Sequence, residues 1–441
     1  MKASAALIAG VTGGTLHGPD VECRGAVIDS RAVAGGELFV PVVAARDGHD
    51  FVAAALEAGA AAYLTSTAPG EGTSVEVEST VTALAELGRW ARGRLPRAVV
   101  GITGSTGKTS TKDMLGAVLS RSRRCAVSPR SFNNDLGVPL TLFNAPEDTE
   151  AVVVEMGARA QGDIRRLCRI AHPSVGLVTN VGMSHTATLG SPEGVARAKS
   201  ELVKELPESG VAVLNADDPA VAAMAAMCAG RVATFGRDAG ETRALDVVVD
   251  GDLRTAFRLV SPWGDARVRL EVRGEHHVAN AVAAAAAALV LGVGMDDVVD
   301  GLGEASLSPW RMAVSRTGAG ALILNDAYNA NPMSTEAALR ALARIDARRR
   351  IAVLGPMLEL GAHSAREHRR IGDLARSLGI DRVIAISAPG YGGDDVADPA
   401  AAVDAVGPVA EGDAVLVKAS RAAGLEHLVT ALCGDAGATP W

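Results

Sequence analysis

The segment 101–109, which reads GITGSTGKT, has the residue types of a phosphate-binding loop. It follows an apolar run and precedes a predicted helix over 110–120, and backbone N–H groups of such a loop converge on phosphate oxygens. We expect Lys108 to reach the β- and γ-phosphates of a nucleotide and Thr109 to ligate Mg²⁺. Because Ile102 replaces the first glycine of the strict pattern, a glycine-rich turn without a ligand is the alternative. The other loop residues expected around the phosphates are Gly104, Ser105, Thr106, Gly107 and Ser110.

Three more side chains have the chemistry to complete a metal site. Glu155 ends the apolar run 151–155, and ligands of open α/β sheets bind at the carboxyl ends of strands. His185 follows the next predicted strand, with a structural histidine as the alternative. Lys199 lies in a predicted helix, where a solvated lysine is the alternative, but only six of the 43 basic residues are lysines. These residue types indicate an ATP-dependent enzyme that uses Mg²⁺ and leave the reaction open.

The elements that must position these residues change in character along the chain. Short strands at 22–28 and 37–43 and helices at 51–58 and 81–94 are predicted first. Buried strands at 98–102, 151–155, 175–179 and 211–215 follow, as in a mostly parallel sheet. Antiparallel strands are predicted at 244–249 and 267–272, an alanine-rich helix at 278–291, and further strands at 321–324, 350–354, 382–386 and 414–417. The pattern predicts an α/β protein of three domains, 1–95, 96–307 and 308–441.

Composition excludes several classes of protein. The 441 residues carry a formal net charge of −8, whereas a nucleic-acid binder normally has a basic face. We find neither a run of ~18–20 apolar residues for a membrane span nor a signal peptide. The five cysteines form no Cys-x-x-Cys pair, which favours a reduced, cytoplasmic protein over a disulfide or zinc scaffold. We therefore expect a cytoplasmic enzyme, monomeric, with small-molecule substrates and with neither nucleic acid nor membrane as a partner.

Several motifs occur together in one order: TGSTGKT at 103–109, SFNNDLGVP at 131–139, EMG at 155–157, GVARAK at 194–199, GEHHVAN at 274–280 and DAYNANP at 326–332. In these motifs the chain resembles the Mur ligases. DSR at 29–31 and DGHDF at 47–51 extend the resemblance over nearly the whole chain. The YNANP segment is most similar to the branch that joins D-alanyl-D-alanine to a UDP-N-acetylmuramoyl-tripeptide in peptidoglycan synthesis.

The resemblance implies a division of labour among the three domains. A small N-terminal α/β domain would bind the uridine nucleotide, a central phosphate-loop ATPase domain would bind ATP, and a Rossmann-like C-terminal domain would complete the site on closure. ATP would convert a peptide carboxylate to an acyl phosphate, which an incoming amine attacks. Charge on the transferring phosphoryl group must then be neutralised by basic side chains and Mg²⁺.

The resemblance also implies roles for individual residues. Lys199 matches a lysine that becomes carbamylated, and a carbamate oxygen is a hard ligand for Mg²⁺. The implied catalytic residues are Lys108, Glu155, His185, Lys199 and Arg311, and the implied metal ligands are Thr109, Glu155, His185 and Lys199. The implied nucleotide contacts outside the loop are His276, Asn280, Arg311 and Asp326. The implied substrate contacts are Asp29, Ser30, Arg31, Asp47, His49, Asn133, Asn134, Tyr328, Asn329 and Asn331.

Each of three of these roles has a structural alternative. Asn280 has the alternative of a polar residue that starts a helix, Arg311 that of a surface salt bridge, and the 47–49 loop that of a turn stabilised by its own Asp and Gly.

Three departures from the family pattern concern the amine and the acyl donor. Pro356 stands where an Asp is usual, Ala419 and Ala422 replace glycines, and the loop 41–47 lacks its usual glycine. We expect the alanines to remove a close backbone approach. A ligase of the same chemistry that joins another acid and amine in a specialised-metabolite pathway is therefore the main alternative. A regulatory protein that only senses nucleotide or precursor is a third hypothesis.

Overall fold

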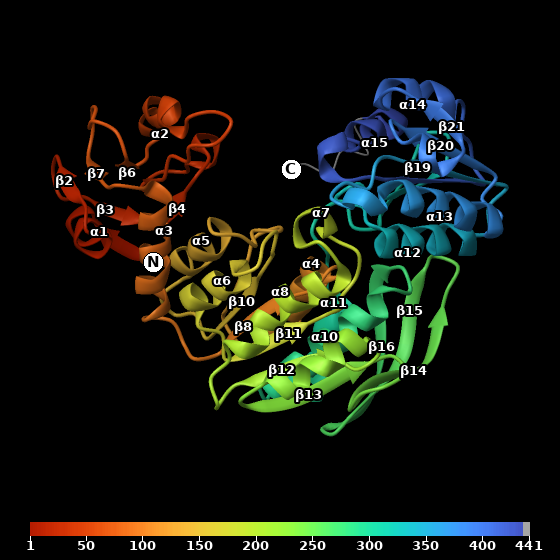
Figure 1. The fold of residues 1–441 in the computed structure, drawn as a ribbon, viewed down its shortest axis with the longest axis horizontal. Coiled ribbons are helices and arrows are strands. Elements are labelled where there is room, and N and C mark those ends of the chain that lie inside the picture. Colours follow the sequence, from red (N-terminus) through yellow and green to blue (C-terminus); the bar gives the residue numbers. More distant parts are fainter. Residues whose placement is uncertain (435–441) are drawn as a thin grey trace.

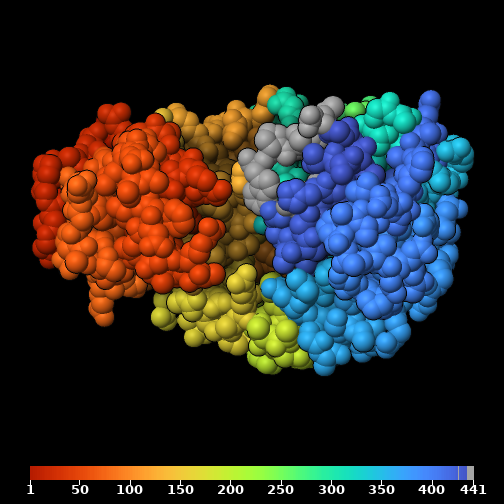
Figure 2. Space-filling view, turned by 90° about the horizontal axis from the view of Figure 1, so that it is seen from above, coloured from red at the N-terminus to blue at the C-terminus, as the bar shows by residue number. Residues whose placement is uncertain are grey.

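The computed structural model describes residues 1–434, and the predicted α/β class is confirmed. The strands form a two-stranded sheet (β1-β3), a five-stranded sheet (β2-β7-β6-β5-β4), a nine-stranded sheet (β16-β15-β14-β13-β12-β11-β8-β10-β9) and a six-stranded sheet (β17-β18-β22-β19-β20-β21). We refer to the parts that carry the two small sheets, the nine-stranded sheet and the six-stranded sheet as the N-terminal, central and C-terminal parts. Figure 1 shows the N- and C-terminal parts on opposite sides above the central sheet, and Figure 2 shows them at opposite ends of the molecule.

The N-terminal part is built from short elements. They are β1 (Lys2–Ser4), α1 (Ala5–Thr12), β2 (Thr15–His17), β3 (Glu22–Arg24), β4 (Ala26–Val27), η1 (Ser30–Ala32), β5 (Leu38–Phe39), η2 (Gly48–Phe51), α2 (Val52–Glu57), β6 (Ala62–Thr65), β7 (Ser74–Glu76) and α3 (Thr80–Arg92). The single strand predicted at 22–28 is wrong, because β3 pairs with β1 and β4 pairs with β5 in a different sheet. The strand predicted at 37–43 is shorter than expected, and the loop after it carries the Asp47 turn.

The central part places mostly parallel strands between two layers of helices. Its elements are β8 (Val99–Thr103), α4 (Lys108–Leu119), β9 (Cys125–Val127), α5 (Gly137–Phe143), β10 (Ala151–Glu155), α6 (Asp163–Ala171), β11 (Val175–Val178), α7 (Thr186–Leu189), α8 (Pro192–Lys204), β12 (Val211–Asn215), α9 (Pro219–Ala222), η3 (Ala223–Met227), β13 (Arg231–Gly236), β14 (Thr242–Val249), β15 (Arg254–Ser261), β16 (Gly264–Arg273), α10 (His277–Val290) and α11 (Met295–Glu304). Residues from α4, α10 and α11 share one core with the sheet, and residues from α3, α5, α6 and α8 share another. The predicted antiparallel strands are confirmed within β14 and β16.

The C-terminal part repeats the strand–helix pattern around its own sheet. Its elements are β17 (Ala313–Arg316), β18 (Leu322–Asn325), α12 (Pro332–Arg344), β19 (Arg349–Leu354), η4 (Gly361–His363), α13 (Ser364–Ser377), β20 (Arg382–Ile386), η5 (Pro389–Tyr391), β21 (Asp394–Val396), α14 (Pro399–Val406), β22 (Asp413–Lys418), η6 (Arg421–Ala423) and α15 (Glu426–Cys433). All neighbours in this sheet are parallel except β17 and β18.

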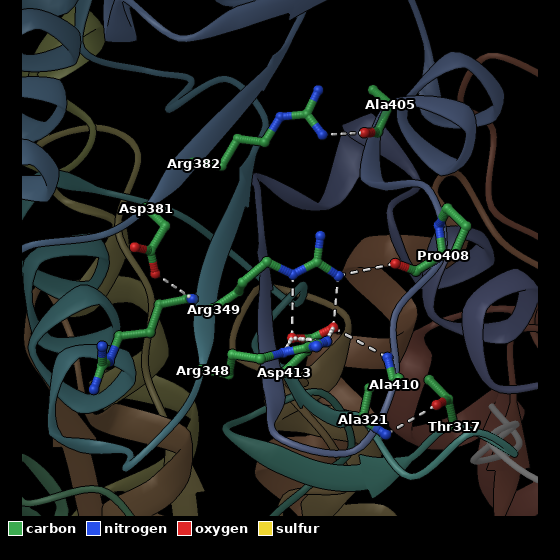
Figure 3. Close-up of polar contacts among 11 residues, drawn as sticks. Thr317, Ala321, Arg348, Arg349, Asp381, Arg382, Ala405, Pro408, Ala410 and Asp413 are labelled. Carbon is green, nitrogen blue, oxygen red and sulfur yellow. Dashed lines mark hydrogen bonds and ion pairs between the residues drawn. The ribbon is translucent and has the colours of Figure 1, made fainter.

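An acidic side chain anchors the amino-terminal ends of β19 and β22. Asp413 is buried, and its carboxylate accepts hydrogen bonds from Arg348 Nη2 at 3.0 Å, from Arg349 Nη2 at 2.6 Å and from the Ala410 N–H at 3.0 Å (Figure 3). Hydrogen bonds from Arg349 hold the pKa of Asp413 well below its usual range. This cluster lies at the opposite strand ends from Asn325 and Lys418, so it serves the fold of the sheet rather than the site described below.

The central part contributes a buried side chain to the core of the C-terminal part, against which Met183 and Val249 also pack. Leu253, at the turn between β14 and β15, is 3% exposed and packs in the same cluster as Leu339 and Leu342 of α12. Its φ of +63° lies in the left-handed region, which a leucine rarely adopts. Hydrogen bonds of the turn, such as that from the Leu253 N–H to the Asp250 carbonyl at 3.0 Å, and packing against the C-terminal part together hold this conformation. None of the described helices has both the length and the apolar composition to cross a membrane.

Candidate active site

The phosphate-binding loop connects β8 to α4 at the carboxyl edge of the central sheet. Gly107 is the N-cap of α4 with φ +79°, and a Cβ there would lie 2.3 Å from Asn280 Oδ1. A Cβ on Gly104 would lie 1.8 Å from Thr179 Oγ1. Both positions therefore require glycine. Lys108 Nζ folds back and donates to the Gly104 carbonyl at 2.8 Å, where it lies over the loop.

A neighbouring loop that the sequence analysis missed braces the phosphate loop. Asn180 follows β11, and its Oδ1 accepts a hydrogen bond from the Thr106 N–H at 2.9 Å while its carbonyl accepts one from the Ser105 N–H at 3.0 Å. Ser105 Oγ in turn accepts from the Gly182 N–H at 2.8 Å. The available signal was the polar pair Thr179-Asn180 directly after a buried strand.

Glu155 and Thr109 meet because β8 and β10 are parallel neighbours, with Glu155 opposite Ile102. Thr109 Oγ1 donates to Glu155 Oε2 at 2.6 Å, and Asn133 Nδ2 donates to Glu155 Oε1 at 2.8 Å. Glu155 is 1% exposed and Thr109 3%. Arg311 of the C-terminal part donates from Nη2 to Thr109 Oγ1 at 2.7 Å. A buried carboxylate, a hydroxyl and a guanidinium thus converge beside the phosphate loop.

The buried Lys199 lies close enough to Lys108, which is partly exposed, to be influenced by its charge. Lys199, in α8, is 2% exposed, and burial together with the nearby charge of Lys108 holds its pKa well below the usual range. Burial also lowers the pKa of Lys108, which Glu155 partly offsets. The burial of Lys199 and the nearby charge of Lys108 both favour a neutral amine at Lys199. The solvated helix lysine of the alternative interpretation is therefore wrong.

His185 contacts a loop of the C-terminal part. Its Nδ1 lies 2.7 Å from Glu359 Oε2, and the Ala187 N–H donates to the Glu359 carbonyl at 3.0 Å. The hydrogen bond with His185 lowers the pKa of Glu359. Glu359 was not anticipated, because no local pattern links it to His185. Within residues 1–434, no cluster of three or more His, Cys, Asp and Glu side chains is arranged to hold a metal ion.

The start of α10 forms a second wall of the loop. His276 and His277 are adjacent, with ring centroids 4.1 Å apart, and burial lowers the pKa of both imidazoles. His277 Nδ1 lies 3.2 Å from Asn280 Nδ2. His276 Nδ1 and His277 Nε2 are buried without a hydrogen-bond partner among the described residues. Buried polar atoms normally have partners, so these two nitrogens are free to bond a ligand.

The residues expected from the C-terminal part divide into two groups. Tyr328 lies under Arg311, 4.4 Å from its guanidinium carbon to the ring centroid, and its hydroxyl contacts the Ser131 hydroxyl. Asp326 instead pairs with Lys418, at 2.5 Å between Oδ2 and Nζ, and Lys418 also donates to the Asn329 carbonyl at 2.8 Å. The guanidinium and the tyrosine face the loop, whereas the Asp326 carboxylate is held within its own part.

Two predicted substrate contacts use their side chains to stabilise the starts of helices. Asn331 Oδ1 accepts from the Ser334 N–H at 2.9 Å as the N-cap of α12. Asn134 Oδ1 accepts from the Gly137 N–H at 2.9 Å at the start of α5. These amides shape the segments that carry Tyr328 and Asn133, respectively.

The predicted uridine contacts lie in two loops of the N-terminal part, away from the phosphate loop. Asp29 caps η1, which begins at Ser30, and accepts from Arg31 Nη2 at 2.7 Å. Asp47 Oδ1 lies 2.6 Å from His49 Nδ1 and also accepts from the His49 N–H at 2.9 Å. Both carboxylates stabilise their own turns, which is the alternative proposed for the 47–49 loop.

At the departures near Pro356, the backbone around Pro356 and the backbone around Ser420 still approach each other closely. The Ser420 N–H donates to the Pro356 carbonyl at 3.1 Å, and the Leu358 N–H donates to Ser420 Oγ at 3.0 Å. A Cβ on Gly355 would lie 2.6 Å from the Cβ of Ala419, so Gly355 provides the space that Ala419 fills. The expectation that Ala419 removes this approach is wrong, because the glycine lies on the facing segment.

Comparison with known proteins agrees with this geometry. Residues 102–288 match the Mur ligase middle domain, and residues 310–436 match the Mur ligase glutamate ligase domain. A Mycobacterium tuberculosis protein named UDP-N-acetylmuramoyl-tripeptide–D-alanyl-D-alanine ligase is 41% identical, with 92% of this chain and 91% of that protein aligned. The chain belongs to the Mur ligase family. Members of this family are ATP-dependent ligases, so the chain is an ATP-dependent ligase rather than a sensor.

Solved structures share the whole architecture of this Mur ligase. MurF from Acinetobacter baumannii is similar with a TM-score of 0.87 and 30% identity, covering 98% of this chain and 99% of that one. The MurF ligase of Thermotoga maritima in complex with ADP has a TM-score of 0.79 and 31% identity, covering 92% of this chain and 96% of that one. The fold of this Mur ligase is thus a three-domain fold known to accompany adenine nucleotide binding.

Proposed function

We propose that this Mur ligase joins D-alanyl-D-alanine to UDP-N-acetylmuramoyl-tripeptide with release of ADP and phosphate, a step of peptidoglycan precursor synthesis. The reactants follow from the name of the full-length relative. The single structural observation that supports the chemistry is the Thr109 hydroxyl, which contacts both Glu155 of the central part and Arg311 of the C-terminal part. A phosphoryl group bound on the loop would meet positive charge from Lys108 and Arg311 on two sides.

The reaction uses that charge in two steps. A carboxylate oxygen of the tripeptide attacks the γ-phosphorus and ADP leaves, which gives an acyl phosphate. The amine nitrogen then attacks the carbonyl carbon, a C–N bond forms, phosphate leaves and the amine loses a proton. Lys108 and Arg311 stabilise negative charge on the transferring oxygens. Asn133 fixes the Glu155 carboxylate. His277 Nδ1 accepts from Asn280 Nδ2, so the neutral imidazole of His277 offers its Nε2–H as a donor to the nucleotide, and His276 offers Nδ1.

The donor set beside the loop fits Mg²⁺. The Glu155 carboxylate and the Thr109 hydroxyl are hard oxygen donors within hydrogen-bond distance of each other. Magnesium in nucleotide sites takes one or two protein ligands and fills its other positions with phosphate oxygens and water, so no larger cluster of carboxylates is needed. Bound there, the ion would neutralise phosphate charge. We propose Thr109 and Glu155 as ligands of one ion and His185 as a ligand of a second.

We further propose that Lys199 is carbamylated. A neutral lysine nitrogen attacks CO₂, a C–N bond forms and one proton leaves, which gives a carbamate anion. The burial of Lys199 and its lowered pKa support the neutral form that this reaction needs. An anionic carbamate would also place a negative charge near the Lys108 ammonium, which attracts it. Arginine has no accessible neutral form and cannot replace it.

We assign the substrate sites to three domains, 1–95, 96–307 and 308–441, the last seven residues of which lie outside the described range. Asp29, Ser30, Arg31, Asp47 and His49 would serve the uridine nucleotide, and Asn133, Tyr328 and Asn329 the peptide end. We also propose that the protein acts as a monomer. ATP and a UDP-linked precursor as reactants support a cytoplasmic location.

Phosphate release from ATP tests the proposal. The purified protein is assayed with the uridine-nucleotide tripeptide and D-alanyl-D-alanine, together and with each omitted. We expect release that depends on both. If neither compound stimulates release while a panel of other acids and amines does, the proposed reactants are wrong and a specialised-metabolite ligase replaces them.

A further inference from the structure

Lys112 is a buried cation that the proposed chemistry does not use. It lies one turn after Lys108 on α4 and is 1% exposed. Its Nζ donates to the Ser128 carbonyl at 2.7 Å and to the Arg130 carbonyl at 2.6 Å, and it lies 2.9 Å from Asp113 Oδ1. The ammonium is therefore enclosed by three oxygens. In a chain with only six lysines, one of them fastens a loop to the phosphate-loop helix.

The fastened loop leads into the active site. Ser128 Oγ accepts a hydrogen bond from the Glu155 N–H at 3.2 Å. Three residues after Arg130, Asn133 holds the Glu155 carboxylate. Arg130 itself has a φ of +50°, in the left-handed region, so its backbone needs external support. Release of the Lys112 contacts would free the segment that orients Glu155.

Asp113 fastens a second segment. Its Oδ2 accepts a hydrogen bond from the Ser308 N–H at 2.7 Å, where the chain passes from the central to the C-terminal part. Three residues later, Arg311 reaches Thr109. Ser308 and Arg311 also line one cavity with Thr109 and Tyr328. The adjacent pair Lys112–Asp113 therefore touches the two segments that bring Asn133 and Arg311 to the phosphate loop.

We infer that Lys112 and Asp113 are positioning residues. They fix the positions of the 128–133 segment and the 308–311 segment relative to α4. Lys112 acts on the Glu155 side and Asp113 on the Arg311 side. Their effect on turnover rests on the proposed function, whereas their effect on the two segments does not. Misplacement of a reacting group by about 1 Å can reduce turnover about 100-fold.

Hydrogen–deuterium exchange on the full chain with ADP tests the inference separately from turnover. We expect K112M to raise exchange about tenfold over 128–134, and D113A to raise it about tenfold over 306–312, since each loses hydrogen bonds to one segment. Strands β18 and β22 should exchange as in the wild type. The matched control is K204M, which removes an exposed lysine of α8 and should change neither segment.

Kinetics supply the second readout. Both variants should lower kcat for phosphate release about 100-fold with a KM for ATP within about threefold of wild type, because the phosphate loop itself is intact. Equal exchange increases across all segments would show a loss of stability and overturn the inference, as would unchanged exchange in both segments. If the wild type fails to turn over with the named reactants but the segment-specific exchange appears, the proposed function falls and the positioning inference stands.

Discussion

Arg311 Nη2 lies 2.7 Å from Thr109 Oγ1, although 202 residues separate them in the sequence. The same hydroxyl donates to Glu155, so a single oxygen joins the carboxyl end of β10 to the segment that opens the C-terminal part. This contact ties the position of the C-terminal part to the phosphate loop. A nucleotide bound on the loop would therefore lie next to side chains of both the central part and the C-terminal part.

Replacement of Arg311 by Gln should reduce kcat by about 10²–10³-fold, because it removes a donor aimed at developing phosphoryl charge. Affinity for ADP, measured by calorimetry, should change much less. The matched control is Arg316→Gln, an exposed residue of β17 that donates to the Gly320 carbonyl in its own turn. An Arg311→Gln enzyme with wild-type kcat would remove Arg311 from the proposed chemistry.

Replacement of Gly107 by Ala should weaken ADP binding by more than tenfold. The new Cβ would lie 2.3 Å from Asn280 Oδ1 and would take a backbone with φ +79°. Gly162 is the control, because it is also a helix N-cap with positive φ, but a Cβ there meets nothing within 4 Å. Both alanines should cost about 1 kcal/mol of backbone strain, yet only Gly107→Ala should change ADP binding in a calorimetric titration.

Replacement of Lys199 by Arg should abolish turnover, and added bicarbonate should not restore it, because a guanidinium cannot form a carbamate. Lys204→Arg, at the exposed end of the same helix, should be fully active. Intact-mass or ¹³C NMR measurement with labelled bicarbonate should detect the carbamate in the wild type and not in Lys199→Arg. An active Lys199→Arg enzyme would rule the carbamate out.

Replacement of Asp413 by Asn should lower the free energy of unfolding by about 2–3 kcal/mol at neutral pH, less than for a fully buried ion pair because both arginines are half exposed. The folded-state pKa of Asp413 is depressed, so its contribution is complete above the unfolded value of about 3.9 and is lost as pH falls below it. Urea titrations should therefore show a constant gap between wild type and variant at pH 6–8 that narrows below about pH 4. The exposed Asp404→Asn variant should show no gap.

Local patterns were sufficient for the elements that carry the phosphate loop. The strand predicted at 151–155 matches β10 residue for residue, because a run of buried valines ends at a charged side chain. Glu155 and Thr109 could be placed together because parallel neighbours end at one edge. The same reasoning failed at 22–28, where a strand changes sheets, since pairing partners are not visible in a single strand.

Long-range contacts account for what the sequence did not predict. Nothing near His185 indicates Glu359, and nothing near Asp326 indicates Lys418, because Glu359 lies in a loop and Lys418 at the end of β22, both distant in the chain. Asn331 is a different case. Asn followed by Pro and, three residues on, by Ser is a helix-start signature, so its capping role was readable before any substrate role.

The placement of Leu253 has a consequence for the order in which the molecule is made. The ribosome completes the β14–β15 turn before any strand of the six-stranded sheet emerges, so one apolar side chain of that later core is already in place. A fragment that starts at Ser308 would lack Leu253. Its core, which contains Leu339 and Leu342, would then have a gap. Exchange of the C-terminal part between relatives would likewise require a turn at 250–253 that fits the incoming core.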